Sequence, residues 1–170
     1  YAKTLRSPHA HANIKSIDFT KALALEGVKA AVSAKDFPET KDTANYGLGD
    51  SPMNYFRGNI LADKKVLYKG QAIAAVAATS VHIAEAALSL IDVEYEVLDA
   101  ILTAPQGMAK DSPILHDDLF TKEFEKQTNV NSNIAEHFQH KMGDIDKGFN
   151  EADIVVELTF DTSTVHQGYI

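Results

Sequence analysis

The 170-residue chain contains no cysteine. It therefore cannot form disulfide bonds, thiolate zinc sites or cysteine-held iron–sulfur clusters, and it offers no cysteine nucleophile. A chain near this length buries about 70% of the surface that its unfolded form exposes, which is enough for a hydrophobic core without a covalent cross-link. We therefore expect one domain that is held together by packing alone.

Basic residues are also scarce, because 16 Lys and Arg stand against 24 Asp and Glu, for a net charge of −8. Since no run of Lys and Arg exceeds two residues, we expect neither a nucleic-acid partner nor an anionic membrane surface. The longest apolar run, Ala72–Ala78, is far shorter than the ~20 residues of a membrane-spanning helix. No export signal is recognisable at the start of the sequence, so we expect no membrane partner and a cytoplasmic location.

Apolar and polar residues alternate in three stretches, and a fourth is apolar throughout. The stretch from Gln71 to Ala78 is nearly all apolar, so we expect it to be the central strand of one mixed sheet, buried on both faces. The alternating stretches are typical of strands with one buried face. The four predicted strands lie near residues 28–33, 66–78, 93–97 and 153–162. In the last of them, one face carries Ile154, Val156, Leu158 and Phe160.

Three helices are predicted, over residues 80–91, 144–152 and 20–26. The first has Ser80 as its N-cap and an apolar stripe at helical spacing that we expect to pack across the sheet. The second is capped by Asp144, and the third is a short turn that Gly27 ends. The apolar stripe consists of Ile83, Ala84, Ala87, Leu88 and Ile91.

Three segments show no clear periodicity of apolar residues, or only a weak one. Residues 43–59 and 117–133 are polar and irregular, and we expect them to be long loops that include a partner-binding face. Residues 134–142 show a weak strand pattern that Glu136 and His140 interrupt. Strands and helices interleave without a strict βαβ rhythm, so the fold class is α+β or mixed α/β.

No self-contained active site is recognisable among the motifs. Gly47–Pro52 is the nearest match to a phosphate-binding glycine loop, but it has Pro where the third Gly belongs, and it joins no predicted strand to a helix. His9 and His11 have a spacing that is compatible with metal binding, although no third ligand is visible nearby. A backbone-bonded turn after Pro8 explains the two histidines more simply.

Four blocks of the sequence resemble segments of one protein family. Residues 1–14, which read YAKTLRSPHAHANI, resemble its "RSPHAHARI" segment. Residues 17–36 and 61–98 resemble its next two blocks, the second through Gly70-Gln71 and Val93-Glu94-Tyr95-Glu96-Val97. Residues 143–153, beginning Gly-Asp-Ile-Asp, resemble its "GDvd.AFaeAdvvve" block. The blocks occur in the family's order and cover nearly the whole chain. The family that they resemble is that of the molybdopterin-dependent hydroxylases, which include xanthine dehydrogenase and aldehyde oxidase.

This resemblance implies an α/β-hammerhead domain over residues 1–170, with one main helix packed across a mixed sheet. It also implies that the last residues lead into a molybdenum-cofactor-binding domain. The complete enzyme would hydroxylate an aldehyde or an aromatic heterocycle, with water as the oxygen source. It would use molybdopterin, as a molybdenum–pterin dinucleotide, together with [2Fe–2S] clusters and usually FAD on partner domains or subunits, and it would be an oligomer. The domain itself is expected to have a structural and assembly role without catalytic or cofactor-binding residues.

Two further expectations concern single residues. Gln167 and Tyr169 resemble the family segment near the substrate funnel, and we expect their amide and phenol groups to orient a polar substrate there. The alternative is that this end of the segment only packs against the next domain. At the level of the whole chain, the alternative function is a free-standing module that binds a small ligand or a metal through His9 and His11.

Overall fold

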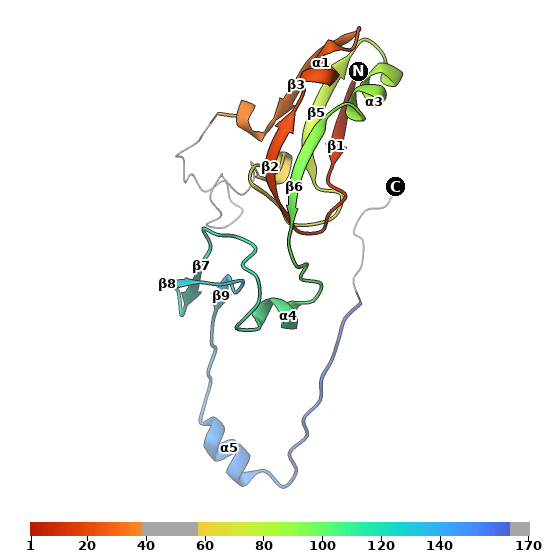
Figure 1. The fold of residues 1–170 in the computed structure, drawn as a ribbon. Helices are drawn as coiled ribbons and strands as arrows, with labels where there is room; N and C mark the ends of the chain where they lie inside the picture. The colour runs from red at the N-terminus through yellow and green to blue at the C-terminus, as the bar shows by residue number, and fades with distance from the viewer. Residues whose placement is uncertain (39–57, 164–170) are drawn as a thin grey trace.

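The computed structural model describes residues 1–38 and 58–163. Three parts are distinguished here: the body (residues 1–38 and 58–99), the lobe (residues 100–137) and the arm (residues 138–163). Figure 1 shows the strands of the body at the top, the small lobe beneath it, and the arm, which descends to a helix and then turns back upward. Among the described residues, no helix is long and apolar enough to cross a membrane.

The first sheet of the body places β5 (Ala72–Ala78) between two other strands. It pairs antiparallel with β1 (Ala2–Arg6) on one side and with β3 (Val28–Ser33) on the other. Ile73 and Val76 in β5 are 0% and 1% exposed. This confirms the prediction of a central strand that is buried on both faces.

The second sheet of the body has the order β4-β2-β6. Its middle strand, β2 (Ala12–Asp18), pairs antiparallel with β4 (Lys65–Val66) and with β6 (Asp92–Val97). In β6, Val93 and Tyr95 are half-buried while Glu94 and Glu96 are exposed, as the alternation predicts. The strand expected near 66–78 is therefore split, because a turn that includes Gly70 separates β4 from β5.

The core lies between the two sheets and under one helix. Ala12 and Val66 of the second sheet pack in one cluster with Ile73 of the first. Val76 belongs to a second cluster, which includes residues of α3 (Val81–Leu88). Because the side chains that meet at the centre are small, the sheets and the helix approach closely, and packing of this kind supplies most of the stability of a small domain.

The main helix begins where the sequence predicts. Ser80 caps α3, since its side chain accepts a hydrogen bond from the backbone N–H of Ile83 at 3.2 Å. Ala84 and Ala87 are fully buried, whereas Ile83 and Leu88 are only half-buried. The prediction that this helix packs on the body is confirmed, but alanines make the closest contact.

The two shorter predicted helices also form. Residues Thr20–Ala24 are α1, which Gly27 follows with a φ of +93°. Residues Ile145–Glu151 are α5, and the side chain of Asp144 caps it by accepting from the N–H of Lys147 at 3.0 Å. A short 3₁₀ turn, η1 (Ala34–Asp36), follows β3.

The sequence-based prediction of one mixed sheet is wrong in two respects. The strands of the described residues form three small sheets, so residues 28–33 and 93–97 lie in different sheets. Residues 153–162 follow an extended trace in Figure 1 but pair with no other described segment, and their side chains are exposed. Alternation shows that a strand has one apolar face, but a strand forms only where a neighbouring backbone completes its hydrogen bonds.

The prediction of a long loop over residues 117–133 is also wrong, because a hairpin forms there. Its strands, β7 (Phe120–Glu123) and β8 (Lys126–Asn131), pair antiparallel, and β9 (Glu136–His137) adds to β7 in parallel. The weak strand pattern over 134–142 thus yields only two strand residues. Residues 43–57 lie outside the described residues.

Side-chain amides hold the lobe together where apolar residues are few. Asn131 donates to the backbone carbonyl of Leu119 at 2.6 Å, and Asn133 donates to that of Pro113 at 2.8 Å. Asn133 also accepts from the N–H of Leu115 at 2.9 Å. The short helix α4 (Ala104–Met108) begins with a capping box formed by Thr103 and Gln106. Polar hydrogen bonds of this kind leave no hydrophobic period in the sequence.

The first prediction tests the central strand. Ile73→Ala should lower the free energy of unfolding by about 2–5 kcal/mol, because a fully buried side chain is replaced by a cavity. The control is Leu23→Ala at a side chain that is 51% exposed, with an expected change within about 0.5 kcal/mol. Urea titrations followed by circular dichroism measure both, and equal losses in the two variants would contradict the burial of β5.

The second prediction compares two glycines in the left-handed region. Gly27 and Gly70 have φ values of +93° and +89°. A Cβ at position 27 would lie 2.7 Å from Ile83 Cδ1 and 2.8 Å from Thr79 Oγ1, whereas a Cβ at position 70 would meet nothing within 4 Å. Gly27→Ala should therefore cost about 1–3 kcal/mol more than Gly70→Ala. Thermal melts of both variants check this, and a Gly70→Ala that is the less stable of the two would contradict it.

Candidate functional site

Of the buried polar side chains of the body, Ser33 lies at the end of β3, and the other three lie together near the turn between β1 and β2. Ser7, His11 and Gln71 are 3%, 2% and 3% exposed. Polar groups at this depth need hydrogen-bond partners, because an unpaired buried donor or acceptor costs free energy. We call these three residues the polar knot.

Gln71 ties the start of β5 to two neighbouring segments. Its Oε1 accepts from the N–H of Leu67 at 2.7 Å, and its Nε2 donates to the carbonyl of Gly58 at 3.2 Å. The backbone of Ser7 donates to the carbonyl of Gln71 and accepts from the N–H of Gly70, both at 2.9 Å. Gln71 thus fixes the turn that leads into the central strand.

His11 fixes the point where the chain leaves the body. Its Nδ1 lies 2.7 Å from the carbonyl oxygen of Asp99, and its own carbonyl accepts from the N–H of Leu98 at 3.0 Å. Since a carbonyl oxygen only accepts, Nδ1 is the donor in this hydrogen bond. Nε2 is buried and has no hydrogen-bond partner among the described residues.

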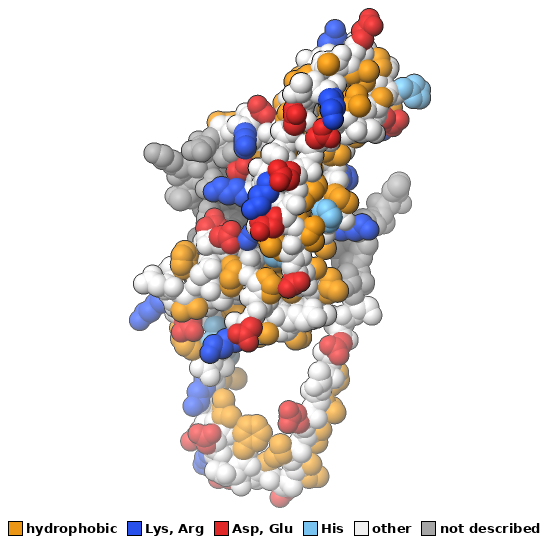
Figure 2. Space-filling view, viewed as in Figure 1, with side chains coloured by type: hydrophobic (Ala, Val, Ile, Leu, Met, Phe, Trp, Pro, Cys, Tyr) orange, Lys and Arg blue, Asp and Glu red, His pale blue; other side chains and the backbone are white. Residues whose placement is uncertain are grey.

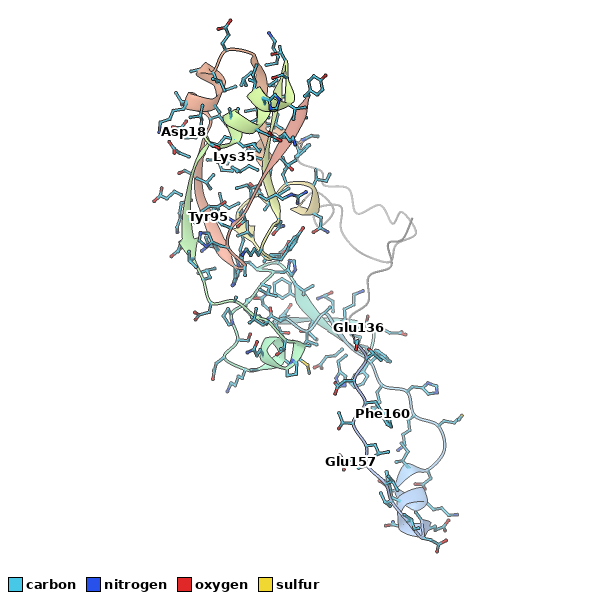
Figure 3. The ribbon with its side chains drawn as sticks, turned by 90° about the vertical axis from the view of Figure 1, so that its right-hand side faces the viewer. Asp18, Lys35, Tyr95, Glu136, Glu157 and Phe160 are labelled. Carbon is cyan, nitrogen blue, oxygen red and sulfur yellow. The ribbon has the colours of Figure 1, made fainter. Side chains whose placement is uncertain are left out.

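His9 and Tyr95 pack edge to face beside the polar knot. Their ring centroids are 4.9 Å apart at an interplanar angle of 72°. Figure 3 shows Tyr95 on the body, on the side of the second sheet. Burial raises the pKa of Tyr95 above its ordinary value, and a hydrogen bond with Ser7 opposes this rise. Both aromatic rings therefore belong to the packing of the turn.

The geometry gives His9 and His11 partners other than a metal. One ring nitrogen of His11 is hydrogen-bonded to the backbone, and the ring of His9 rests on Tyr95. Within residues 1–38 and 58–163, no group of three or more His, Asp, Glu or Cys side chains is placed to hold a metal ion. A structural zinc site needs four ligands and a catalytic one needs three, so this pair alone does not provide a metal site.

A groove between β2, the segment Ser33–Lys35 and Ala62 encloses a cavity of about 50 Å³. Sites for drug-sized ligands occupy roughly 300–1,000 Å³. The groove therefore has room for water but not for a pterin or a dinucleotide.

The surface of the body is charged and mixed in sign. Exposed ion pairs join Lys3 to Glu85 at 2.8 Å and Lys21 to Asp92 at 2.6 Å. Figure 2 shows acidic and basic side chains interspersed over the body, while hydrophobic side chains follow the arm below it. Exposed pairs of this kind add little stability but keep the surface free of one dominant charge.

The ion pair between the body and the lobe involves a more deeply buried lysine than the surface pairs do. Lys65 in β4 reaches the lobe, where its Nζ donates to the carbonyl of Ile114 at 3.1 Å and to the carboxylate of Asp117 at 2.8 Å. Its side chain is only 14% exposed, whereas that of Asp117 is 74% exposed. This contact joins the lobe to the body, while the bond from His11 to Asp99 fixes the end of the body from which the lobe departs.

Gln167 and Tyr169, the substrate-funnel candidates, lie outside the described residues, as does Gly47–Pro52. Their roles stay predictions. The polar knot was not predicted as a unit, because each of its members is a single polar residue without a periodic signal. The one available signal was Gln71, a polar residue directly ahead of an entirely apolar run.

The model of one protein family matches residues 1–99, and its description is "Aldehyde oxidase and xanthine dehydrogenase, a/b hammerhead domain". The match covers the body from its first strand to Asp99, whose carbonyl is bonded to His11. The chain belongs to this family.

Curated relatives extend the similarity over the whole chain. The chain is 33% identical to the probable hypoxanthine oxidase XdhD of Escherichia coli K12, over 97% of this chain and 20% of the relative. It is 35% identical to the nicotinate dehydrogenase large molybdopterin subunit of Eubacterium barkeri, over 100% of this chain and 35% of the relative. The chain thus spans about a fifth to a third of the length of these relatives.

Solved structures show the same fold in longer proteins. The aldehyde oxidoreductase of Desulfovibrio gigas superposes with a TM-score of 0.54 at 30% identity, over 69% of this chain and 13% of that one. A Cu,Mo-CO dehydrogenase in its carbon monoxide reduced state superposes with a TM-score of 0.63 at 29% identity, over 91% of this chain and 19% of that one. The hammerhead domain is therefore homologous to part of the large subunits of molybdenum hydroxylases.

The names of these relatives mention molybdopterin and molybdenum. Within the described part of this hammerhead domain, the groove beside β2 is too small for a pterin, and no group of three or more His, Asp or Glu side chains is placed to hold a metal ion. No chemical step is therefore assigned to the side chains of the body.

The third prediction concerns pH. Because burial raises the pKa of Tyr95, its contribution to stability is fully present below the unfolded pKa of about 10 and is lost as the pH rises through the folded pKa. The wild-type chain should therefore lose stability more steeply above pH ~10 than Tyr95→Phe does. Urea titrations on both sides of this pH measure the difference. Tyr68→Phe, at a tyrosine that is 51% exposed, is the control, and a Tyr95→Phe that follows the wild-type curve would contradict the prediction.

Proposed function

We propose that this hammerhead domain is a scaffold and assembly domain in the large subunit of a molybdenum hydroxylase. The complete enzyme would hydroxylate an aldehyde or an aromatic heterocycle, with water as the oxygen source. The observation that carries the proposal is the family match over residues 1–99, which includes both hydrophobic core clusters of the body. The buried members of these clusters are alanine, valine and isoleucine, which suit a scaffold that positions other parts of a protein.

The relatives support a role that does not depend on the substrate. Proteins named for hypoxanthine, nicotinate and carbon monoxide are 33%, 35% and 34% identical to this chain. Because the similarity is nearly equal across different named substrates, it reflects a task that these proteins share. We therefore assign substrate choice to parts of the large subunit outside residues 1–163.

The cofactors of the proposed enzyme would be held by other parts of the assembly. Molybdopterin would be bound by the remaining domains of the large subunit, while [2Fe–2S] clusters and FAD would be carried by partner domains or subunits. The absence of cysteine from the chain is consistent with this division, since iron–sulfur clusters are held by thiolates. Gln167 and Tyr169 remain candidates for a role near the substrate funnel.

The fourth prediction tests the proposed function. The complete large subunit, purified with its partner subunits, should contain stoichiometric molybdenum by elemental analysis and oxidise an aldehyde or a heterocycle from a substrate panel. The 170-residue chain should contain no stoichiometric molybdenum and oxidise none of them, because its described residues provide neither a cradle nor a ligand set.

Far-ultraviolet circular dichroism of the same 170-residue sample confirms that the body is folded when its activity is measured. Molybdenum bound to the 170-residue chain would overturn the proposal, as would an inactive, molybdenum-free complete complex.

A further inference from the structure

The arm exposes a long series of large apolar side chains. From Phe138 to Phe160 it contacts neither the body nor the lobe through a buried residue, since every residue from 138 to 163 is exposed. Large exposed apolar surfaces mark interaction sites in proteins. The side chains concerned are Phe138, Met142, Ile145, Phe149, Ile154, Val155, Val156, Leu158 and Phe160, with exposed fractions from 44% to 85%.

In two stretches of the arm, the apolar side chains lie on one side, as they do in a helix or strand that packs one face against other residues. In α5, Ile145 and Phe149 are four residues apart and therefore lie on the same side of the helix. Beyond it, four alternate residues from Ile154 to Phe160 are apolar and 68% to 84% exposed, whereas two of the three residues between them are polar. Figure 3 shows Glu157 and Phe160 on the limb of the arm that returns from α5.

The backbone of the returning limb also lacks a strand partner among the described residues. Residues 153–162 are extended, yet no other described segment is hydrogen-bonded to them as a strand partner. An extended segment with one apolar face forms a stable strand when a sheet edge supplies both backbone partners and an apolar surface. We propose that residues 153–161 form an added β-strand on a sheet of the remaining large subunit, with the Ile154–Phe160 face covered.

This inference rests on the proposed function, because the occupant is the part of the large subunit outside the present chain. The relatives support that occupant, since the chain spans only 20% of the E. coli relative. The superposition on the CO dehydrogenase covers 91% of the chain and leaves out about 15 of its 170 residues, fewer than the 26 residues of the arm. Part of the arm is therefore included in an alignment with a protein about five times as long.

The shape of the arm agrees with an occupant of this kind. Figure 2 shows an opening between the descending and the returning limbs, with hydrophobic side chains along both. A second copy of the arm is a poorer occupant, because the polar face carries Asp153, Glu157 and Asp161. Two antiparallel copies would bring these carboxylates into neighbouring positions on one face, where like charges repel.

Neighbouring valines provide a matched test. Val156 belongs to the apolar face and Val155 to the opposite one, and both are exposed here, at 71% and 59%. In the complete large subunit, Val156→Asp should lower the yield of assembled, molybdenum-containing enzyme about tenfold or more, because it buries an unpaired carboxylate. Val155→Asp should leave the yield within about twofold of wild type, since it adds a charge to a solvated face. Equal effects of the two substitutions would overturn the face assignment.

Hydrogen exchange tests the strand without relying on assembly. Backbone amides of residues 153–161 should exchange rapidly in the 170-residue chain and become protected in the complete large subunit, because a sheet ladder then binds them. Rapid exchange in both would overturn the proposal. Protection in the 170-residue chain that rises with its concentration, together with a dimer in light scattering, would do the same in favour of a second copy.

The proposed function and the strand proposal are contradicted by different results. If the wild-type complete subunit lacks molybdenum and activity, the proposed function fails, while hydrogen exchange still reports on the strand. If the wild-type enzyme is active but its residues 153–161 exchange as fast as those of the 170-residue chain, only the strand proposal fails.

Discussion

Burial of β5 on both faces is the constraint on which the rest of the body depends. A strand of seven residues that contains five alanines can be covered closely from both sides, and only because its side chains are small do two sheets and α3 reach it together. The neighbouring elements follow the same rule, since α3 presents Ala84 and Ala87 rather than its larger side chains. Gly27 extends this close approach to the turn before β3, where a Cβ would touch Ile83. Bulk at any of these positions would separate the layers.

Polar contacts then determine where the chain can enter and leave this packed body. Gln71 holds the turn that leads into β5, and His11 binds the carbonyl of Asp99 where the chain departs toward the lobe. The family match ends at that same residue, so the boundary of the family model coincides with a hydrogen bond rather than with a flexible linker. Lys65 adds a second contact, to Ile114 and Asp117 of the lobe. Lys65 thereby holds the lobe, which few apolar side chains support, against the body.

The sequence predicted those parts of the fold that depend on local pattern and burial. The all-apolar run of β5, the strand pattern of β6 and the cap at Ser80 each act within a few residues, and each is confirmed, although Val97 on the apolar side of β6 is 62% exposed. Two kinds of prediction failed. Pairing with strands far along the chain divides the described strands between separate sheets, whereas the local hairpin of β7 and β8 is held by amides such as Asn131, which leave no hydrophobic period in the sequence. The polar knot was not predicted either, because its three residues come together only after folding.

Residues 153–162 were predicted to be a strand but have no strand partner among the described residues. Their alternation is as regular as that of β6, yet β6 has β2 beside it and this segment has no described neighbour. Binary patterning describes the environment for which a segment is suited. The described residues supply that environment to β6 but not to residues 153–162. The relatives are three to five times as long as this chain, which supports the proposal that another part of the large subunit supplies it.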